Sequence, residues 1–333
     1  MIVSFGEALI DLFGHPRGAT VDEAEYFVPH TGGALANAAL TCGRLGVETR
    51  FIGAVGRDAH GDRVLRELGA AGVDTRCIAR VAERTAVTFV RVRDDGARSF
   101  LFYRTKTADH AMSPVLLDAM SAHPLDGATW LLTGTSALVA EPIASAYRAL
   151  VRAAKDRGVA RVVDLNVRPH LWSDHGAMRA AVRDIVAGAA VVKASEEDLA
   201  ALGLDATLDA LATLAPDALP LLTLAERGAT FRLAGGAFER PAVALDAAAV
   251  VDSTGAGDAF IAGFLSLLDA RGATVDTLRG DLALVRDAVD VGCALGAMAV
   301  TRMGATAGVR APWPASVIEA FSKRQRPAQG VTP

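Results

Sequence analysis

The stretch Val250-Val251-Asp252-Ser253-Thr254-Gly255-Ala256-Gly257-Asp258-Ala259-Phe260 places a glycine-rich turn directly before an apolar segment that is typical of a buried helix. Gly255 and Gly257 carry no side chains, so the backbone can turn sharply there. The N–H groups at the start of the helix would have no intrahelical acceptors, and the helix dipole adds partial positive charge. This turn therefore suits an anionic group, most often a phosphate.

Asp258 lies at the same helix start as the predicted anion site. A carboxylate there would repel a bound anion, unless it takes up a proton from an incoming hydroxyl while the amides stabilise the transferring group. This favours phosphoryl transfer to an alcohol, with Asp258 as the base. The alternative from spacing alone is a glycine-rich turn whose Asp caps a helix.

Composition is that of an ordinary globular protein, with 333 residues, 51% hydrophobic residues, 22% charged residues and a formal net charge of -4. This mild acidity offers no basic field, so we expect neither nucleic acid nor a membrane as a partner. Cys42, Cys77 and Cys293 are too few and too far apart to indicate a disulfide framework or a metal site. The N-terminus lacks the features of a signal peptide, and we expect a cytoplasmic protein.

Short apolar runs alternate with helical patterns along most of the chain, which predicts an α/β fold with a mostly parallel sheet. The predicted strands are Ile2–Phe5, Thr49–Val55, Thr129–Leu132, Arg161–Leu165, Ala190–Lys193 and Leu219–Leu224. The predicted helices are Ala34–Leu45, Gly61–Ala71, Ala140–Arg157, Gly176–Ala187, Glu196–Leu202 and Asp258–Leu268.

Two segments, 12–31 and 85–104, interrupt this alternation. In the second, the turn Asp94-Asp95-Gly96 separates two β-rich runs, which indicates a hairpin. We expect both segments to form a β lid, although an immobile extension of the sheet edge fits the sequence equally well. The predicted organisation is an α/β core (1–11, 32–84 and 105–325), the lid (12–31 and 85–104) and a frayed tail (326–333).

The motif Asp252–Phe260 resembles the C-terminal motif of the ribokinase (PfkB) family of sugar kinases. The stretch 32–56 is similar to the N-terminal motif of that family, and the resemblance extends over residues 2–323. It implies a ribokinase-like three-layer sandwich with a small antiparallel β lid. It also implies that Asp258 is the catalytic base and that Gly255, Ala256 and Gly257 form the anion hole.

The segments at the expected sugar site resemble those of fructokinases most closely. The resemblance implies sugar contacts for Asp11, Gly32, Gly33, Asn37, Phe102, Arg104, Asn166 and Arg168. From the residues alone, three of these side chains could have a different role: Asp11 could be a solvated turn acid, Asn37 a locally bonded amide, and Arg104 an exposed edge-strand cation.

A second group of residues would bind ATP and its metal ions. The resemblance implies nucleotide contacts for Lys193, Ser195, Thr223, Glu226, Gly228 and Ala294. It implies Mg²⁺ near Asp164 and Asp198, and a monovalent cation such as K⁺ near Asp252, Thr254 and Gly304. Ser195 and Asp198 stand where many relatives have Asn and Glu, so Asp198 would reach Mg²⁺ through water. Ala225 replaces the usual first glycine of the nucleotide loop, and a positive φ there would cost about 1 kcal/mol.

Together, these segments predict an ATP-dependent sugar kinase, with fructose as the first candidate substrate and a homodimer through the lid, as in many relatives. The alternatives are a 2-keto-3-deoxygluconate kinase, a ribokinase and a nucleoside kinase of the same fold. A sugar or nucleotide sensor without catalysis is the alternative from another class.

Overall fold

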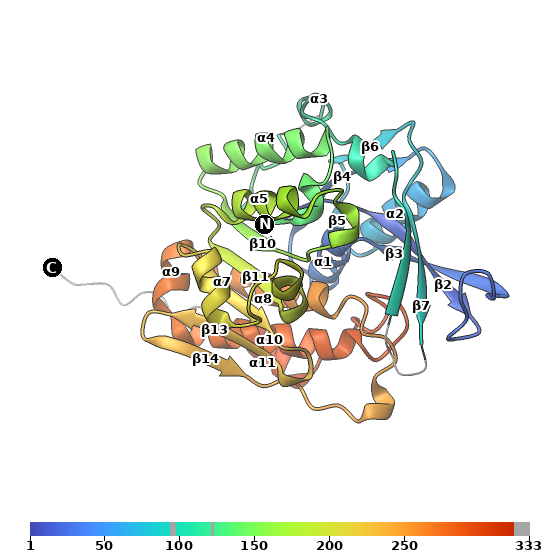
Figure 1. Ribbon diagram of the computed structural model, residues 1–333. Coiled ribbons are helices and arrows are strands. Elements are labelled where there is room, and N and C mark those ends of the chain that lie inside the picture. Colours follow the sequence, from blue (N-terminus) through green and yellow to red (C-terminus); the bar gives the residue numbers. More distant parts are fainter. Residues whose placement is uncertain (94–97, 121–122, 323–333) are drawn as a thin grey trace.

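The computed structural model describes residues 1–93, 98–120 and 123–322, and Figure 1 shows their arrangement. The predicted turn Asp94-Asp95-Gly96 and the predicted frayed tail 326–333 lie outside these residues. The described part folds as a large central sheet between two layers of helices, with a smaller sheet at one side.

The central sheet is mostly parallel, as the sequence predicts. Its strand order is β14 (Gly236–Arg240), β13 (Ala229–Leu233), β12 (Leu219–Thr223), β11 (Val191–Ser195), β10 (Ala160–Asp164), β9 (Trp130–Gly134), β1 (Ile2–Phe5), β4 (Thr49–Gly56) and β5 (Val73–Asp74). A further strand, β6 (Ile78–Val81), also pairs with β4. Only the pairs at one edge, β12–β13 and β13–β14, are antiparallel. The central strands are continuous apolar runs because both of their faces are covered.

Helices cover both faces of this sheet. One layer contains α1 (Ala34–Arg44), α2 (Ala59–Ala70), α8 (Ala256–Ala270), α10 (Leu282–Ala299) and α11 (Ala315–Ser322). The other contains α3 (Pro114–Asp118), α4 (Ile143–Asp156), α5 (His175–Val186), α6 (Glu196–Ala201) and α7 (Leu208–Leu214). Shorter connections are α9 (Val275–Gly280) and the 3₁₀ helices η1 (Ala108–Ala111), η2 (Thr135–Leu138), η3 (Pro169–Leu171), η4 (Ala225–Arg227) and η5 (Ala247–Ala249). Two apolar cores, one on each face, hold the three layers together.

The smaller sheet is built from the two segments that we expect to form a lid, and we refer to it as the lid. Its strand order is β3 (Tyr26–Gly32), β2 (Leu9–His15), β7 (Val87–Val92) and β8 (Arg98–Tyr103). The outer pairs are antiparallel, as expected, whereas the central β2–β7 pair is parallel. The sheet begins at Leu9, earlier than the expected boundary at residue 12, because residues 9–11 already pair with β3 and residues 10–11 with β7. Asp11 is therefore part of the lid sheet.

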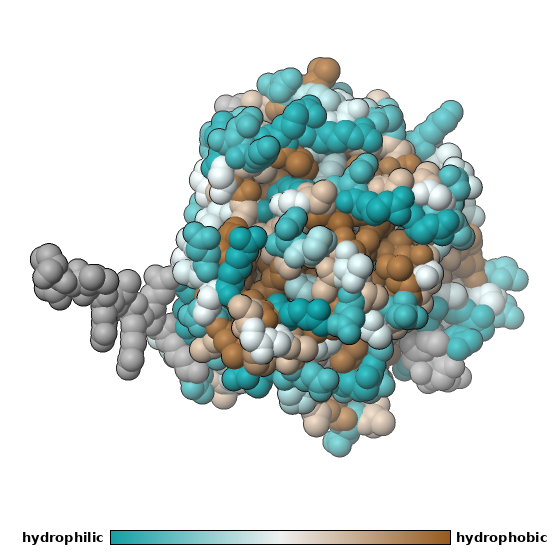
Figure 2. Space-filling view, turned by 60° about the vertical axis from the view of Figure 1, so that its left-hand side comes forward, coloured by the Kyte–Doolittle hydropathy of each residue, from teal (hydrophilic) through white to brown (hydrophobic). Residues whose placement is uncertain are grey.

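Asp11, Thr88 and Phe102 lie in one row across the lid, because Asp11 is in register with Thr88 and Thr88 with Phe102. The outer face of the molecule is mixed: Figure 2 shows hydrophobic residues between hydrophilic ones toward the middle of the face. No helix among the described residues is long and apolar enough to cross a membrane.

Helix α8 is buried along most of its length, from Ala259 to Leu268. It packs on α10 through glycines on both helices. A Cβ atom on Gly263 would lie 2.8 Å from Leu295 Cδ1, and one on Gly292 would lie 2.9 Å from the Phe260 carbonyl oxygen. These glycines let the two helices approach closely, which fixes the position of the turn before α8.

We predict that Gly292→Ala destabilises the protein, because the new methyl group meets backbone as well as the Phe260 ring. Overpacking costs about 1–3 kcal/mol, which exceeds the gain of up to about 1 kcal/mol in helix propensity. The matched control is Gly69→Ala in α2, where a Cβ would meet no atom within 4 Å. Denaturant unfolding should show a loss of stability in the first variant and none in the second. Equal effects would contradict the close packing of α8 on α10.

Candidate active site

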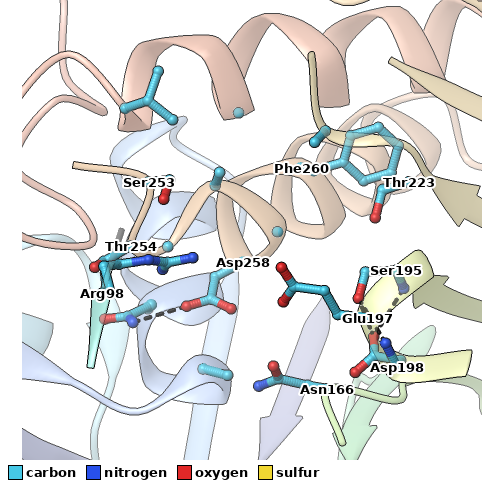
Figure 3. Close-up of a pocket in the computed structure, with 18 of the residues that line it drawn as sticks. Arg98, Asn166, Ser195, Glu197, Asp198, Thr223, Ser253, Thr254, Asp258 and Phe260 are labelled. Carbon is cyan, nitrogen blue, oxygen red and sulfur yellow. Dashed lines mark hydrogen bonds between the residues drawn. The ribbon is translucent and has the colours of Figure 1, made fainter. Parts of the chain in front are cut away.

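A cavity of about 690 Å³ lies at the carboxyl ends of the parallel strands, between the lid and the start of α8. This edge is where ligands bind in open α/β sheets. Glu7 follows β1, Ser136 follows β9 and Asn166 follows β10, and all three line the cavity. In Figure 3, Asp258 projects from α8 toward the middle of the cavity, and Glu197 approaches from the opposite wall.

The glycine-rich turn has the geometry that the sequence predicts. Gly255 is the N-cap of α8 and is left-handed, with φ 78°. A Cβ at this position would lie only 2.4 Å from the Ala305 carbonyl oxygen, so a larger residue does not fit. Gly255, Ala256 and Gly257 all line the cavity. None of them has a side chain larger than a methyl group, so the helix start is open to an anion.

The buried carboxylate of Asp252 holds this turn from behind. Its Oδ1 accepts hydrogen bonds from the Thr254 backbone N–H (2.9 Å) and hydroxyl (2.6 Å), and its Oδ2 accepts one from the Gly304 N–H (2.9 Å). The structure thus brings together the three residues predicted for a monovalent cation. Thr254 lines the cavity, whereas Asp252 and Gly304 do not.

Asp258 is half-buried and accepts a hydrogen bond from Asn37 Nδ2 at 2.9 Å. Burial raises the pKa of Asp258, while the Asn37 hydrogen bond and the charges of Lys193 and Arg168 oppose the rise. A raised pKa makes a carboxylate a better proton acceptor near neutral pH. The Asn37 Oδ1 is buried without a hydrogen-bond partner among the described residues, so it can accept a hydrogen bond from a hydroxyl group of a ligand.

Asp11 lies against Gly32 on the lid side of the cavity, and the next residue, Gly33, lies against Glu7. A Cβ on Gly32 would lie 2.2 Å from Asp11 Oδ2, and one on Gly33 would lie 2.4 Å from the Glu7 carbonyl oxygen. Both glycines are therefore required by the local packing. Burial, and then the nearby charge of Asp258, raise the pKa of Asp11 to about 7. Asp11 is buried, so it is not a solvated turn acid.

Phe102 and Arg104 line the cavity from β8 and the residues that follow it. Phe102 stacks on His170 with a centroid distance of 4.2 Å. Arg104 is only 7% exposed, and its Nη2 lies 2.6 Å from Asp109 Oδ2. The exposed edge-strand alternative for Arg104 is therefore wrong, because Asp109 compensates its charge in the interior.

Asn166 and Arg168 complete this end of the cavity. Asn166 adopts φ 40°, a conformation that Asn tolerates better than most residues, and Figure 3 shows its amide directed into the cavity. The Arg168 Nη1 donates to the Val167 carbonyl oxygen at 3.1 Å.

The far end of the cavity is lined by the residues that follow β12 and by small and apolar residues of α10. Thr223, Glu226 and Gly228 contribute to it, and Ala225 adopts the left-handed φ of 51° despite its side chain. Ala294, predicted to contact the nucleotide, is buried and does not line the cavity. Instead, Cys293, Gly296, Ala297 and Val300 form the α10 wall, because these positions share a helix face that excludes residue 294.

The acids expected near Mg²⁺ are engaged with the protein. Asp198 Oδ1 accepts from the Val167 N–H (2.6 Å), and its Oδ2 accepts from the Ser195 N–H (2.8 Å) and hydroxyl (2.9 Å). Asp164 is paired with Lys193 Nζ at 3.0 Å and does not line the cavity. Among residues 1–93, 98–120 and 123–322, no group of three His, Cys, Asp or Glu could hold a metal ion.

Most of the predicted site residues meet in this one cavity. Those that line it are Asp11, Gly33, Asn37, Phe102, Arg104, Asn166, Arg168, Lys193, Ser195, Asp198, Thr223, Glu226, Gly228, Thr254, Gly255, Ala256, Gly257 and Asp258. Those that do not are Gly32, Asp164, Asp252, Ala294 and Gly304.

Several cavity residues were not predicted from the sequence. Glu7, Thr88, Arg98, Ser136 and Glu197 are among them. Glu7 directly precedes the predicted Asp11 segment and could have been found from its place after the first strand. Ser136 had no comparable signal, because it lies in a 3₁₀ turn after a strand with no motif of its own.

Comparisons with known proteins agree with this geometry. Residues 1–312 match the family described as pfkB family carbohydrate kinase. The chain is 32% identical over 317 residues to the probable fructokinase-5 of Arabidopsis thaliana, covering 94% of this chain and 95% of that protein. It is similar to the structure of a fructokinase with bound ATP from Xylella fastidiosa, with a TM-score of 0.81, 30% identity, and coverage of 96% of this chain and 97% of the other.

A second similar structure is that of a fructokinase double mutant from Vibrio cholerae O395 in a form with fructose, ADP and potassium ion bound. Its TM-score is 0.81 at 27% identity, covering 97% of this chain and 98% of the other. The chain therefore belongs to the pfkB family of carbohydrate kinases, and it is a sugar kinase that transfers a phosphoryl group.

Proposed function

We propose that the chain is an ATP-dependent fructokinase that phosphorylates the primary hydroxyl of fructose. The observation that carries this proposal is the position of Asp258, which Asn37 orients at the open helix start, in one cavity with Asp11. The relatives with the names fructokinase and probable fructokinase support the choice of sugar.

Binding of the sugar would depend on acceptors and donors that the fold already fixes. The Asp11 carboxylate and the unpartnered Asn37 Oδ1 accept from sugar hydroxyls, and the Asn166 amide can do both. Phe102 covers one side of the cavity from the lid and excludes water.

Transfer then requires a base and a site for negative charge. Asp258 takes the proton of the primary hydroxyl as its oxygen forms a bond to the γ-phosphorus of ATP and the bond to the ADP oxygen breaks. The N–H groups at the start of α8 stabilise the charge on the phosphoryl oxygens. Mg²⁺ bound to the ATP phosphates would neutralise further charge. Asp198 lines the cavity and would face it through water, because protein groups already bond its two oxygens, whereas Asp164 pairs with Lys193 outside the cavity.

A monovalent cation such as K⁺ would bind at the loop formed by Asp252, Thr254 and Gly304. This loop lies directly behind the anion hole, so a cation there would strengthen the positive potential at the turn. The potassium ion in the Vibrio cholerae structure supports this proposal.

The 2-keto-3-deoxygluconate alternative is disfavoured by charge. Its substrate carries a carboxylate. Arg104 is already neutralised by Asp109, and the carboxyl group of Asp11 lies in the same part of the cavity, which leaves Arg168 as the cation at this end that could face that carboxylate. The ribokinase, nucleoside kinase and sensor alternatives have no such observation against them, and activity measurements separate them.

The outer face of the lid supports a homodimer, since Leu101 and Tyr103, which alternate with Phe102 along β8, are 45% and 59% exposed. Exposed apolar side chains gathered on one small sheet are typical of an interface. Light scattering should give the mass of a dimer, and a monomer at micromolar concentration would contradict this. The buried unpaired thiols of Cys42, Cys77 and Cys293 are consistent with the proposed cytoplasmic location.

We predict ADP release with fructose that exceeds the rates with 2-keto-3-deoxygluconate, ribose and adenosine at fixed ATP and Mg²⁺. The reason is that the sugar end offers the hydroxyl acceptors Asp11, Asn37 and Asn166, and the carboxyl groups of Asp11 and Asp258 disfavour an anionic substrate beside them. Added KCl should increase the rate. A higher kcat/KM for another substrate in the panel would make that substrate the preferred one in place of fructose. Binding of a sugar without turnover would support the alternative of a non-catalytic sensor.

We predict that Asp258→Asn lowers kcat by about 10²–10⁴ because the amide cannot accept the hydroxyl proton. ATP affinity should stay nearly unchanged, since the turn amides are untouched. The matched control is Asp174→Asn, at the exposed N-cap of α5, where Asn also caps well. Near-normal turnover in Asp258→Asn would show that Asp258 is not the base.

We predict that fructose binds more tightly at pH 8 than at pH 6. Asp11 has a pKa of about 7, so its carboxyl group is mostly protonated at pH 6 and mostly ionised, and thus a stronger acceptor, at pH 8. The expected change in Kd, measured by calorimetry with ADP present, is up to about tenfold. Asp11→Asn should bind weakly and show no change with pH. An unchanged pH dependence in this variant would contradict the assignment.

A further inference from the structure

The ammonium group of Lys193 lies directly against the glycine-rich turn. A Cβ atom on Gly257 would be 2.9 Å from Lys193 Nζ, with Cε the only other atom within 4 Å. The ammonium can approach the turn this closely because Gly257 has no side chain. Lys193 itself lines the cavity from the end of β11.

The hydrogen bonds of Lys193 are incomplete. An ammonium has three donors, and the described residues provide only one acceptor, Asp164 Oδ1 at 3.0 Å. The lysine side chain is 5% exposed and that of Asp164 is 3% exposed, so little water is available to satisfy the other donors. Burial opposes the charge of Lys193, but Asp164 and Asp198 overcome it and raise the pKa of the lysine.

A purely structural role does not account for this arrangement. A buried ion pair by itself contributes little to stability, because both charges lose hydration. Asp164 lies away from the cavity, whereas the positive end of the pair faces the turn where an anion would bind. The neighbouring acid, Asp198, accepts three hydrogen bonds from Ser195 and Val167, and among the described residues Lys193 donates none to it.

We propose that Lys193 is a further catalytic residue, whose ammonium donates to the phosphoryl oxygens during transfer beside Gly257, with Asp164 as its positioning residue. Lys193 keeps its protons throughout: the hydroxyl proton goes to Asp258, and the broken bond leaves its electrons on ADP. The inference depends on the kinase activity and not on the choice of fructose.

The test compares Lys193→Met with wild-type enzyme, using ATP and fructose for turnover and ADP alone for binding. Loss of a preorganised donor to the transferring group should lower kcat by about 10²–10³-fold. The Kd of ADP should change by less than about threefold, because the γ-phosphoryl group is absent from ADP. The affinity for ADP with aluminium fluoride and fructose, which imitates the transferring group, should fall in parallel with kcat.

The matched control is Arg161→Met, which removes a buried cation from β10, the strand that carries Asp164. Arg161 donates to the Tyr147 hydroxyl and the Ile185 carbonyl and does not line the cavity. This variant should lose stability and keep kcat within about threefold of wild type. Asp164→Asn should lower kcat less than Lys193→Met does and leave the KM for fructose unchanged.

Two results would overturn the proposal: a kcat of Lys193→Met within about fivefold of wild type, or an ADP affinity that falls as much as kcat does. If the single variant fails to fold, Lys193→Met with Asp164→Asn removes both charges and should show the same loss of kcat. A wild-type enzyme inactive with fructose would contradict the proposed substrate alone, and the experiment would then use the most active sugar of the panel.

Discussion

The left-handed conformation of Gly255 is the constraint on which the site depends. It allows the chain to enter α8 with its first N–H groups facing the cavity, and it leaves no room for a side chain beside Ala305. The turn is held from two directions. The Asp252 carboxylate accepts hydrogen bonds from the backbone N–H groups of Thr254 and Gly304, and the buried apolar residues of α8 fix the helix that follows the turn. Polar and apolar contacts thus fix the same few atoms, so the turn that we propose as the anion site is already formed without a ligand.

Much of this arrangement was predictable from local sequence. The order of strands and helices, the glycine-rich turn and Asp258 all follow from patterns within a few residues, because they are set by backbone geometry and periodicity. The hairpin pairing of β7 and β8 was predicted for the same reason. Ala225 stands where the nucleotide loop usually has a glycine, and it still adopts the left-handed backbone conformation.

What the sequence did not predict depends on contacts between distant segments. The parallel pairing of β2 with β7 joins strands that are far apart in the chain, and no local signal specifies it. Arg104 was expected to contact the sugar and does line the cavity, but only the packed structure shows that Asp109 balances its charge. Ala294 was placed on the wrong helix face by one residue, because a motif gives the helix but not its rotation.

The row formed by Asp11, Thr88 and Phe102 has one more consequence. These side chains come from three adjacent strands, so the backbone hydrogen bonds of the lid hold them about 4.8 Å apart per strand. The strand pairing of the lid therefore fixes the spacing of these three side chains, and no single substitution among them can widen it. A substitution at Asp11, Thr88 or Phe102 would therefore change the chemical group that faces the cavity and leave the distance between the strands unchanged.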